Sequence, residues 1–278
     1  MPEGPEARTV SDKLRPYLVT RVITGSYVGP RAKTIGFFNL KYPATIIGVR
    51  SHGKKVLIDL DTGHMIIISL GMAGRVQYSP GDHSHVRFDI SDSETKGAFK
   101  VMKQVFSLYF DDHRYMGGVD IIPNAGIPLY FKDIGPDLLQ AALDEKTWIP
   151  LDKWLSIYTQ KKLKNRTICD VLLDQDLVAG IGNYLRCDIL YYAMINPLRK
   201  VESISTHEWD LIRVCSHKVI LLAYSYRGFT IESFISPDGE MGTYPAAVYG
   251  KDFDPHGNPV IKTDVKDRKI HWVPTVQV

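Results

Sequence analysis

The sequence predicts an α+β protein of two domains. The first is rich in β-strands with one flanking helix, and the second is helical with a terminal β-hairpin. Three observations support this fold class. Short runs rich in Val, Ile and Phe follow one another between residues 21 and 110. Helical periodicity dominates residues 137–225, and strand-like runs return after residue 246. A chain of 278 residues is long enough for two ordinary domains.

The N-terminal part begins with an amphipathic helix and continues as a sheet. Apolar residues recur about every 3.6 positions over residues 4–18, and Pro5 falls in the first turn, where proline is tolerated. The runs that follow are separated by turn signals such as Asp61-Thr62-Gly63, which is typical of a sandwich or barrel. The expected strands are residues 21–28, 44–50, 55–60, 64–70, 85–90 and 104–110.

A break at Gly135-Pro136-Asp137 divides the chain into the two expected domains, residues 1–133 and residues 134–278. The last helix of the second domain has Ser205 and Thr206 as candidate N-caps, with Glu208 placed to complete a capping box. The expected helices are residues 137–145, 150–160, 166–176, 183–193 and 205–225. The expected C-terminal strands are residues 246–250, 259–264 and 269–273.

Composition narrows the class of protein. No apolar run is as long as a membrane span, and the first residues do not resemble a signal peptide. We therefore expect an intracellular protein of the cytoplasm or nucleus that is not secreted. The net charge of +3 leans mildly toward polyanionic partners. The three cysteines lie far apart without a Cys-x-x-Cys pair, so we expect neither a disulfide framework nor a cysteine zinc site. We also expect no cofactor, because an N-terminal amine can do the covalent work.

The opening Met1-Pro2-Glu3 offers covalent chemistry. Removal of Met1 leaves a secondary amine on Pro2, of which about a tenth is neutral at pH 7. Attack of this amine on an aldehyde-level carbon gives an iminium, which acts as an electron sink. Glu3 is adjacent and can shuttle protons. The plainer interpretation is that many proteins begin Met-Pro without catalytic meaning.

Two further motifs indicate phosphate binding. Gly180 and Gly182 lie between helical segments, and Asn183 begins the next helix, so backbone amides with the Asn183 side chain can hold a phosphate oxygen. The alternative is an ordinary helix-to-helix turn. In the tail, Arg268 at a hairpin can bind phosphate bidentately, although an exposed arginine on an edge strand is the commoner case.

Taken together, the opening, residues 173–185 and the tail resemble, in order and position, the formamidopyrimidine-DNA glycosylase/endonuclease VIII (Fpg/Nei) family. The resemblance implies a helix–two-turn–helix element. It also implies a zincless finger over about residues 246–278, because the tail has no cysteine. This favours the Nei-like branch, in which the packing of four apolar residues would replace the metal. They are Val260, Ile261, Ile270 and Trp272.

The resemblance also implies the activity and the partner. The activity is that of a bifunctional DNA glycosylase and AP lyase of base excision repair, which forms a Schiff base and cuts by β,δ-elimination. Oxidised pyrimidines and further-oxidised guanine products are the favoured substrates, and specificity for 8-oxoguanine is left open. The partner is damaged DNA, duplex or single-stranded, bound by a monomer without zinc.

Carried over residue by residue, the resemblance assigns roles near the reacting sugar. Pro2 is the nucleophile, Glu3 the acid/base residue and Glu6 an ordering residue, and Lys54 holds a phosphate. Lys55 is adjacent to Lys54 and easily confused with it.

The same resemblance assigns the DNA contacts. Asn183 and Arg268 grip phosphates, and three residues fill the space left by the extruded base. They are Met72, Arg114 and Met116. Tyr115 and Met116 stand where the family has Arg and Phe, so the wedge departs from the family pattern.

Three rival functions are weighed against this one. A catalytically silent DNA-binding protein would explain the altered residues 115 and 116, but it would not need both Pro2 and Glu3. A ribosomal or topoisomerase component with a helix–two-turn–helix would lack the Met-Pro-Glu opening. A zinc enzyme lacks ligands.

Overall fold

The computed structural model describes residues 1–37, 40–96, 99–230 and 234–278. The chain forms two compact units. The sheet unit comprises Met1–Pro2, Glu6–Lys132 and Thr230–Gly242, and the helical unit comprises Glu3–Pro5, Asp133–Phe229 and Thr243–Val278. The expected domain boundary between residues 133 and 134 stays a prediction. The units differ from it in two short segments, 3–5 and 230–242, and at Asp133, which belongs to the helical unit.

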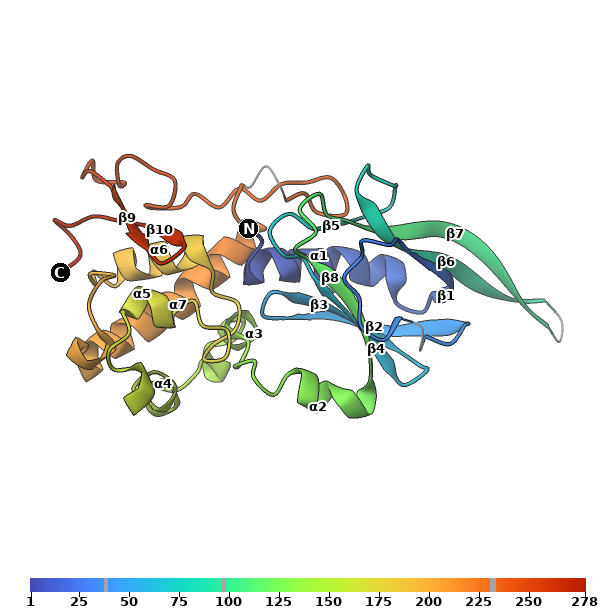
Figure 1. Ribbon diagram of the computed structural model, residues 1–278, viewed down its shortest axis with the longest axis horizontal. Coiled ribbons are helices and arrows are strands. Elements are labelled where there is room, and N and C mark those ends of the chain that lie inside the picture. The colour runs from blue at the N-terminus through green and yellow to red at the C-terminus, as the bar shows by residue number, and fades with distance from the viewer. Residues whose placement is uncertain (38–39, 97–98, 231–233) are drawn as a thin grey trace. The chain divides into compact units, whose positions relative to one another are not determined.

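The sheet unit is built on eight antiparallel strands in the order β5-β7-β6-β1-β2-β3-β4-β8 (Figure 1). Only two residue pairs, Val22 with Thr45 and Ile23 with Ala44, join β1 to β2, so the sheet falls into two four-stranded groups. The strands are β1 Val22–Val28, β2 Ala44–His52, β3 Lys55–Leu60, β4 His64–Ser69, β5 Arg75–Gln77, β6 Ser84–Lys96, β7 Phe99–Asp111 and β8 Gly118–Pro123.

One apolar core holds this unit together. Helix α1, Gly4–Leu18, buries the predicted stripe completely, with Leu14 and Leu18 at 0% exposure. The same core contains Phe88 of the first strand group and Ile66 of the second, so it lies between two layers as in a sandwich. Burying one such leucine stabilises the fold by about 1.5–3 kcal/mol. A short helix, α2 Ile127–Tyr130, follows β8.

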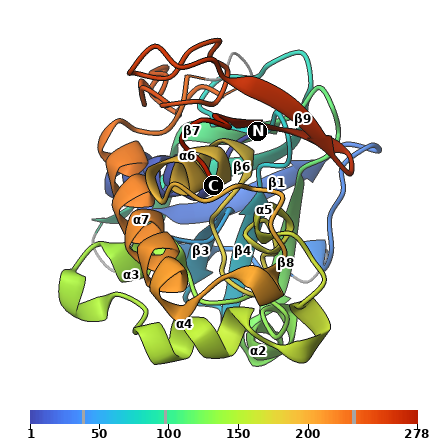
Figure 2. The same cartoon turned by 90° about the vertical axis from the view of Figure 1, so that its left-hand side faces the viewer.

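The first three helices of the helical unit are shorter than the sequence predicts, whereas the last two differ from their expected ranges by one residue. Helix α7 begins after Ser205, whose side chain accepts from the Glu208 amide while the Glu208 carboxylate accepts from the Ser205 amide. The expected capping box is confirmed. Figure 2 shows this helix, coloured orange, beside the other helices of the unit. The helices are α3 Leu138–Ala142, α4 Leu151–Tyr158, α5 Ile168–Val171, α6 Asn183–Tyr192 and α7 Thr206–Ser225.

The chain ends in a hairpin of β9, Ile261–Val265, and β10, Arg268–Trp272, which lies against α6 in both views (Figures 1 and 2). Ile270 and Trp272 are buried in the core of the helical unit, and Val260 packs against it. The expected packing role of Ile261 is wrong, because this side chain is 40% exposed and does not belong to that core.

The strand expected at residues 246–250 is also absent from the structure. The amides of Ala247, Val248 and Tyr249 donate to the carboxylate of Asp188 instead of to a neighbouring strand. Within the described ranges, no helix is long and apolar enough to cross a membrane.

Candidate functional site

The first turn of α6 binds a buried carboxylate. The buried carboxylate of Glu3 accepts hydrogen bonds from the amides of Gly182, Tyr184 and Leu185 at 2.7, 2.9 and 3.4 Å. Gly182 is required here, because an added Cβ would lie 2.2 Å from Glu3 Cδ. The expectation that these amides bind phosphate is wrong, since a carboxylate of the same chain already takes them.

The turn before α6 is shaped by one side chain that sequence reasoning passed over. The Gln175 amide donates to the carbonyl oxygens of Leu173 and Ile181, both at 2.8 Å, and accepts from the Gly180 amide at 3.0 Å. Gly180 has φ +111°, a conformation that side chains rarely adopt. Together these residues fix the tight turn that aims the start of α6.

Asn183 and Arg268 are brought together by the hairpin. Asn183 Nδ2 donates to the Lys269 carbonyl at 3.0 Å, and Asn183 Oδ1 accepts from Arg186 Nη2 at 2.7 Å. Arg186 is buried, and burial lowers the pKa of its guanidinium, which the positive charge of Arg268 lowers further. Asn183, Arg186 and Arg268 therefore form one positively charged corner, with Arg268 next to the residue that Asn183 contacts.

The hairpin turn is held by an ion pair. Lys266 has φ +55° in the two-residue turn, and its Nζ lies 2.8 and 2.9 Å from the two carboxylate oxygens of Asp170 in α5. Asp170 also accepts from Arg166 Nε at 2.8 Å, and Arg166 contacts Asp174 at 2.6 Å. Burial alone would raise the pKa of Asp170, but the two cations together outweigh it and hold this pKa below its usual value. The turn that precedes Arg268 is thus tied to the helix before the Gln175 loop.

Asp188 is a second residue that sequence reasoning missed. Its carboxylate is fully buried on α6 and accepts from the Tyr244 hydroxyl at 2.8 Å and the Ala247 amide at 2.8 Å. Val248 and Tyr249 donate at 3.2 and 3.4 Å. Burial raises the pKa of Asp188, while these four donors act in the opposite direction. An acidic residue directly followed by the apolar pair Ile189 and Leu190 was the available signal.

In the sheet unit, Pro2 and Glu6 are buried at the start of the chain. The structure gives different surroundings to Lys54 and Lys55, the two neighbouring lysines that are easily confused in the sequence. Lys54 lies in the turn between β2 and β3, whereas Lys55 Nζ contacts Ser69 Oγ at 2.8 Å and lies 5.3 Å from the centre of the Tyr130 ring. Burial lowers the pKa of the Lys55 ammonium.

Two loops of the sheet unit carry the expected void-filling residues. Met72 lies in the turn after β4, and Arg114 and Met116 lie in the loop after β7. The loops touch, since a Cβ on Gly71 would lie 2.5 Å from the Gly117 amide nitrogen. Met116 is 56% exposed and Arg114 is also exposed, which leaves both side chains available to a ligand.

Asp112 shapes the second loop. Its buried carboxylate accepts from the amides of Arg114, Met116 and Gly117 at 3.0, 2.8 and 2.7 Å. Tyr115, which stands in place of the family arginine, packs beside His85 at 5.3 Å and under Arg31 at 5.8 Å. Its ring therefore belongs to the loop's support. Among the residues described, no three His, Cys, Asp or Glu side chains come close enough to hold a metal ion.

These features define a class. The chain combines a β-sandwich with a Pro-Glu start, a tight turn leading to an Asn-initiated helix, and an Arg-bearing hairpin on that helix. This is the architecture of the helix–two-turn–helix DNA glycosylases of base excision repair.

Sequence comparison supports the same class. Residues 1–119 match the formamidopyrimidine-DNA glycosylase N-terminal domain, and residues 151–234 match the formamidopyrimidine-DNA glycosylase H2TH domain. The formamidopyrimidine-DNA glycosylase of Carboxydothermus hydrogenoformans is 28% identical, with 100% of each chain covered. That of Thermomicrobium roseum is 27% identical over 93% of this chain and 90% of the relative.

Solved structures agree. The chain is similar to the MutM (Fpg) protein of Thermus thermophilus, with a TM-score of 0.83, 27% identity and coverage of 99% and 98% of the two chains. It is also similar to Lactococcus lactis Fpg bound to DNA containing an oxidised pyrimidine, with a TM-score of 0.80, 25% identity and 99% coverage of both. This chain belongs to the formamidopyrimidine-DNA glycosylase family. The expected family and the α+β fold are confirmed.

Proposed function

We propose that the chain is a bifunctional DNA glycosylase and AP lyase that removes oxidised bases through the amine of Pro2. The observation that carries the proposal is the fixed position of Glu3. Three amides at the start of α6 hold its carboxylate, so the residue next to Pro2 is anchored on the helix whose Asn183 is the proposed phosphate ligand. The proposed acid/base residue and the proposed phosphate ligand are therefore both positioned by the start of α6.

The proposed reaction balances without a cofactor. With Met1 removed, the Pro2 nitrogen attacks the anomeric carbon of the damaged nucleotide, the bond to the base breaks, and the proton of the Pro2 nitrogen passes to the departing base. Glu3 then protonates the sugar ring oxygen, and the bond between this oxygen and the anomeric carbon breaks. The nitrogen lone pair then gives an iminium, which acidifies the neighbouring carbon and permits β- and then δ-elimination of the two phosphates. Hydrolysis of the imine returns the Pro2 amine. Glu6 is buried in the first turn of α1, where it is proposed to order the start of the chain.

The proposed DNA contacts come from both units. Lys54, Asn183 and Arg268 are proposed to bind phosphates, which implies a steep loss of affinity with salt. Met72, Arg114 and Met116 are proposed to fill the stack where the base is extruded. The exposure of Arg114 and Met116 and the contact between the two loops support this role.

Oxidised pyrimidines and further-oxidised guanine products are the proposed substrates, on the basis of the cysteine-free tail. The relatives named above are formamidopyrimidine-DNA glycosylases, and two Lactococcus lactis structures contain DNA with Fapy-dG or an oxidised pyrimidine. Purine lesions such as formamidopyrimidines are therefore the second candidate. Side-by-side cleavage of duplexes carrying thymine glycol and formamidopyrimidine decides between them.

Borohydride trapping tests the mechanism. The protein is mixed with an oligonucleotide carrying an oxidised pyrimidine, reduced, and resolved by mass after removal of Met1 has been confirmed. We expect a covalent complex that disappears in Pro2→Gly, while binding to the same DNA persists. A matched abasic-site oligonucleotide separates lyase from glycosylase activity. Failure to trap either oligonucleotide would instead indicate a silent DNA-binding protein.

A further inference from the structure

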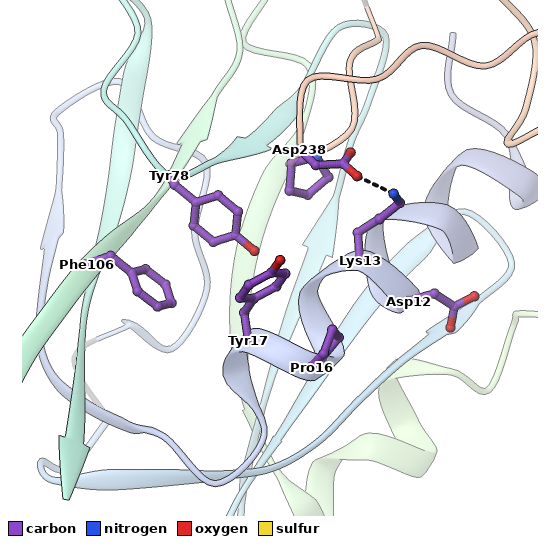
Figure 3. Close-up of a pocket in the computed structure, with 8 residues that line it drawn as sticks. Asp12, Lys13, Pro16, Tyr17, Tyr78, Phe106 and Asp238 are labelled. Carbon is purple, nitrogen blue, oxygen red and sulfur yellow. Dashed lines mark hydrogen bonds and ion pairs between the residues drawn. The ribbon is translucent and has the colours of Figure 1, made fainter.

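A second site lies in the sheet unit, away from the residues assigned to repair. It is a half-open cavity of about 560 Å³ formed by the C-terminal half of α1, Tyr78 after β5, Phe106 of β7 and the segment around Pro237 (Figure 3). Its volume falls in the range of small-molecule pockets. Tyr17 is 13 residues after Gly4 on α1, about 20 Å along the helix at 1.5 Å per residue. The cavity is therefore remote from Pro2.

Aromatic rings line the cavity. Tyr17 and Tyr78 meet edge to face with ring centres 5.9 Å apart, and Tyr78 and Phe106 do so at 5.2 Å. Pro16 and Pro237 add apolar surface, so the wall is largely hydrophobic. Tyr17 is 54% exposed and presents its ring to an incoming group, as Figure 3 shows. Such a wall favours a flat, unsaturated ligand that can stack.

One polar atom in this wall lacks a partner among the described residues. The Tyr78 hydroxyl is buried without a hydrogen bond and points toward the hydroxyl end of Tyr17 (Figure 3). Burial raises the pKa of Tyr78 to about 12, so the hydroxyl keeps its proton at neutral pH. A buried hydroxyl without a partner is costly, and a carbonyl oxygen would satisfy it once the exposed Tyr17 ring turned aside.

The charges at the rim indicate an uncharged ligand. Lys13 is ion-paired with Asp238 and with Glu240, the latter at 3.2 Å, so two carboxylates share one ammonium. Asp12 is paired with Arg8 at 2.9 Å and with Arg15 at 3.1 Å. Among the described lining residues, no cation is left to neutralise a phosphate, because Lys13 is already shared.

We propose that this cavity binds a planar heterocycle carrying a carbonyl group, of the nucleobase class, stacked on Tyr17 and hydrogen-bonded to Tyr78. Such a base can come from two sources: a free nucleoside or base, or an unpaired base in a single strand. The acidic rim favours the first. The proposal does not depend on the repair activity.

Saturation-transfer NMR on the full chain tests the proposal, with thymidine as the probe and 2′-deoxyribose as the base-free control. We expect thymidine to bind saturably and 2′-deoxyribose not to bind. Tyr17→Ala should weaken it at least about fivefold through lost stacking, and Tyr78→Phe about two- to tenfold through the lost hydrogen bond. Tyr27→Ala is the matched control, because Tyr27 is 53% exposed on β1 and outside the cavity.

A second arm distinguishes the sources. Hexathymidylate is titrated with and without excess thymidine, and each variant is checked for an unchanged unfolding midpoint. If thymidine binds with the expected variant effects, a free base is the ligand. If only the hexamer binds, and Tyr17→Ala weakens it while Tyr27→Ala does not, the base belongs to a strand. Absence of saturable binding by both probes, or equal binding by Tyr17→Ala, overturns the proposal.

Discussion

The ion pair between Lys266 and Asp170 is expected to position Arg268 for DNA binding. Lys266 is 67% exposed and Asp170 is 13% exposed. Because the lysine end of the pair is largely exposed to solvent, the pair contributes about 0.2–1 kcal/mol, so Lys266→Met should leave the unfolding midpoint almost unchanged. If the lost pair frees the turn before Arg268, the same energy appears in DNA affinity as a loss of up to about fivefold.

The assay is fluorescence anisotropy with a duplex carrying an uncleavable abasic analogue, at several salt concentrations. Lys262→Met is the control. It removes one positive charge from the same hairpin, and Lys262 lies 3.7 Å from Asp252, which is 86% exposed. We expect the effect of Lys266→Met to exceed that of the control and to vanish in an Arg268→Ala background, since the pair then has nothing to position.

Asp170→Asn gives the refuting test because the two explanations predict opposite signs. If Lys266 positions the turn, loss of its carboxylate partner weakens DNA binding. If Lys266 is itself a phosphate ligand restrained by Asp170, the variant gains one net positive charge and binds more tightly. Arg166 keeps its 2.6 Å contact to Asp174 in this variant, so that side chain remains held. Tighter binding would refute the positioning role.

Three further substitutions test buried polar groups of the helical unit. Gly182→Ala places a Cβ within 2.2 Å of Glu3 Cδ, so we expect a loss of about 1–3 kcal/mol in urea unfolding together with reduced trapping; full activity would contradict the fixed Glu3. His217 is buried on α7, where its Nε2 accepts from the Ile149 amide at 3.0 Å. Burial lowers the pKa of His217 to about 4, below its usual 6.5, so this neutral ring stabilises the fold above pH 6.5. That stability is lost as pH falls from 6.5 toward 4, by at most about 1.4 kcal/mol per pH unit, and His217→Gln should flatten this slope in pH-dependent unfolding. Asp188→Asn places an amide group opposite two of the four donors, so we expect the free energy of unfolding to fall by about 2–4 kcal/mol. An unchanged free energy in chemical denaturation would show that Asp188 does not hold residues 244–249 in place.

Local patterns in the sequence predict the elements with strong periodicity or caps. The stripe of α1, the capping box of α7 and the strands β1 to β4 are confirmed because each depends on residues a few positions apart. Strand β8 was missed although Val119 and Ile121 alternate inward, and three-residue β5 is too short to show a period. Helix α5 has four residues where eleven were expected, because Gln175 satisfies the backbone of a turn there.

The site was harder to predict than the fold. Pro2, Asn183 and Arg268 were found through motifs, and their roles stay predictions. The partners of Glu3 were not found, since they lie about 180 residues away in the sequence and leave no periodic signal. Asp188 and Asp112 were missed for a different reason: the amides that bind each carboxylate belong to irregular segments, which have no periodic pattern.

The hydrogen bonds between Glu3 and α6 determine which truncated fragments of this protein can be expected to fold. Gly4 adds a backbone bond to the Gly180 carbonyl at 2.9 Å, so the first residues complete a helical unit whose other members begin at Asp133. A recombinant fragment starting at residue 134 would expose the amides of Gly182 and Tyr184 without their carboxylate. A fragment that contains the helical unit alone would therefore need residues Glu3–Pro5, from the start of the chain, to be joined to it.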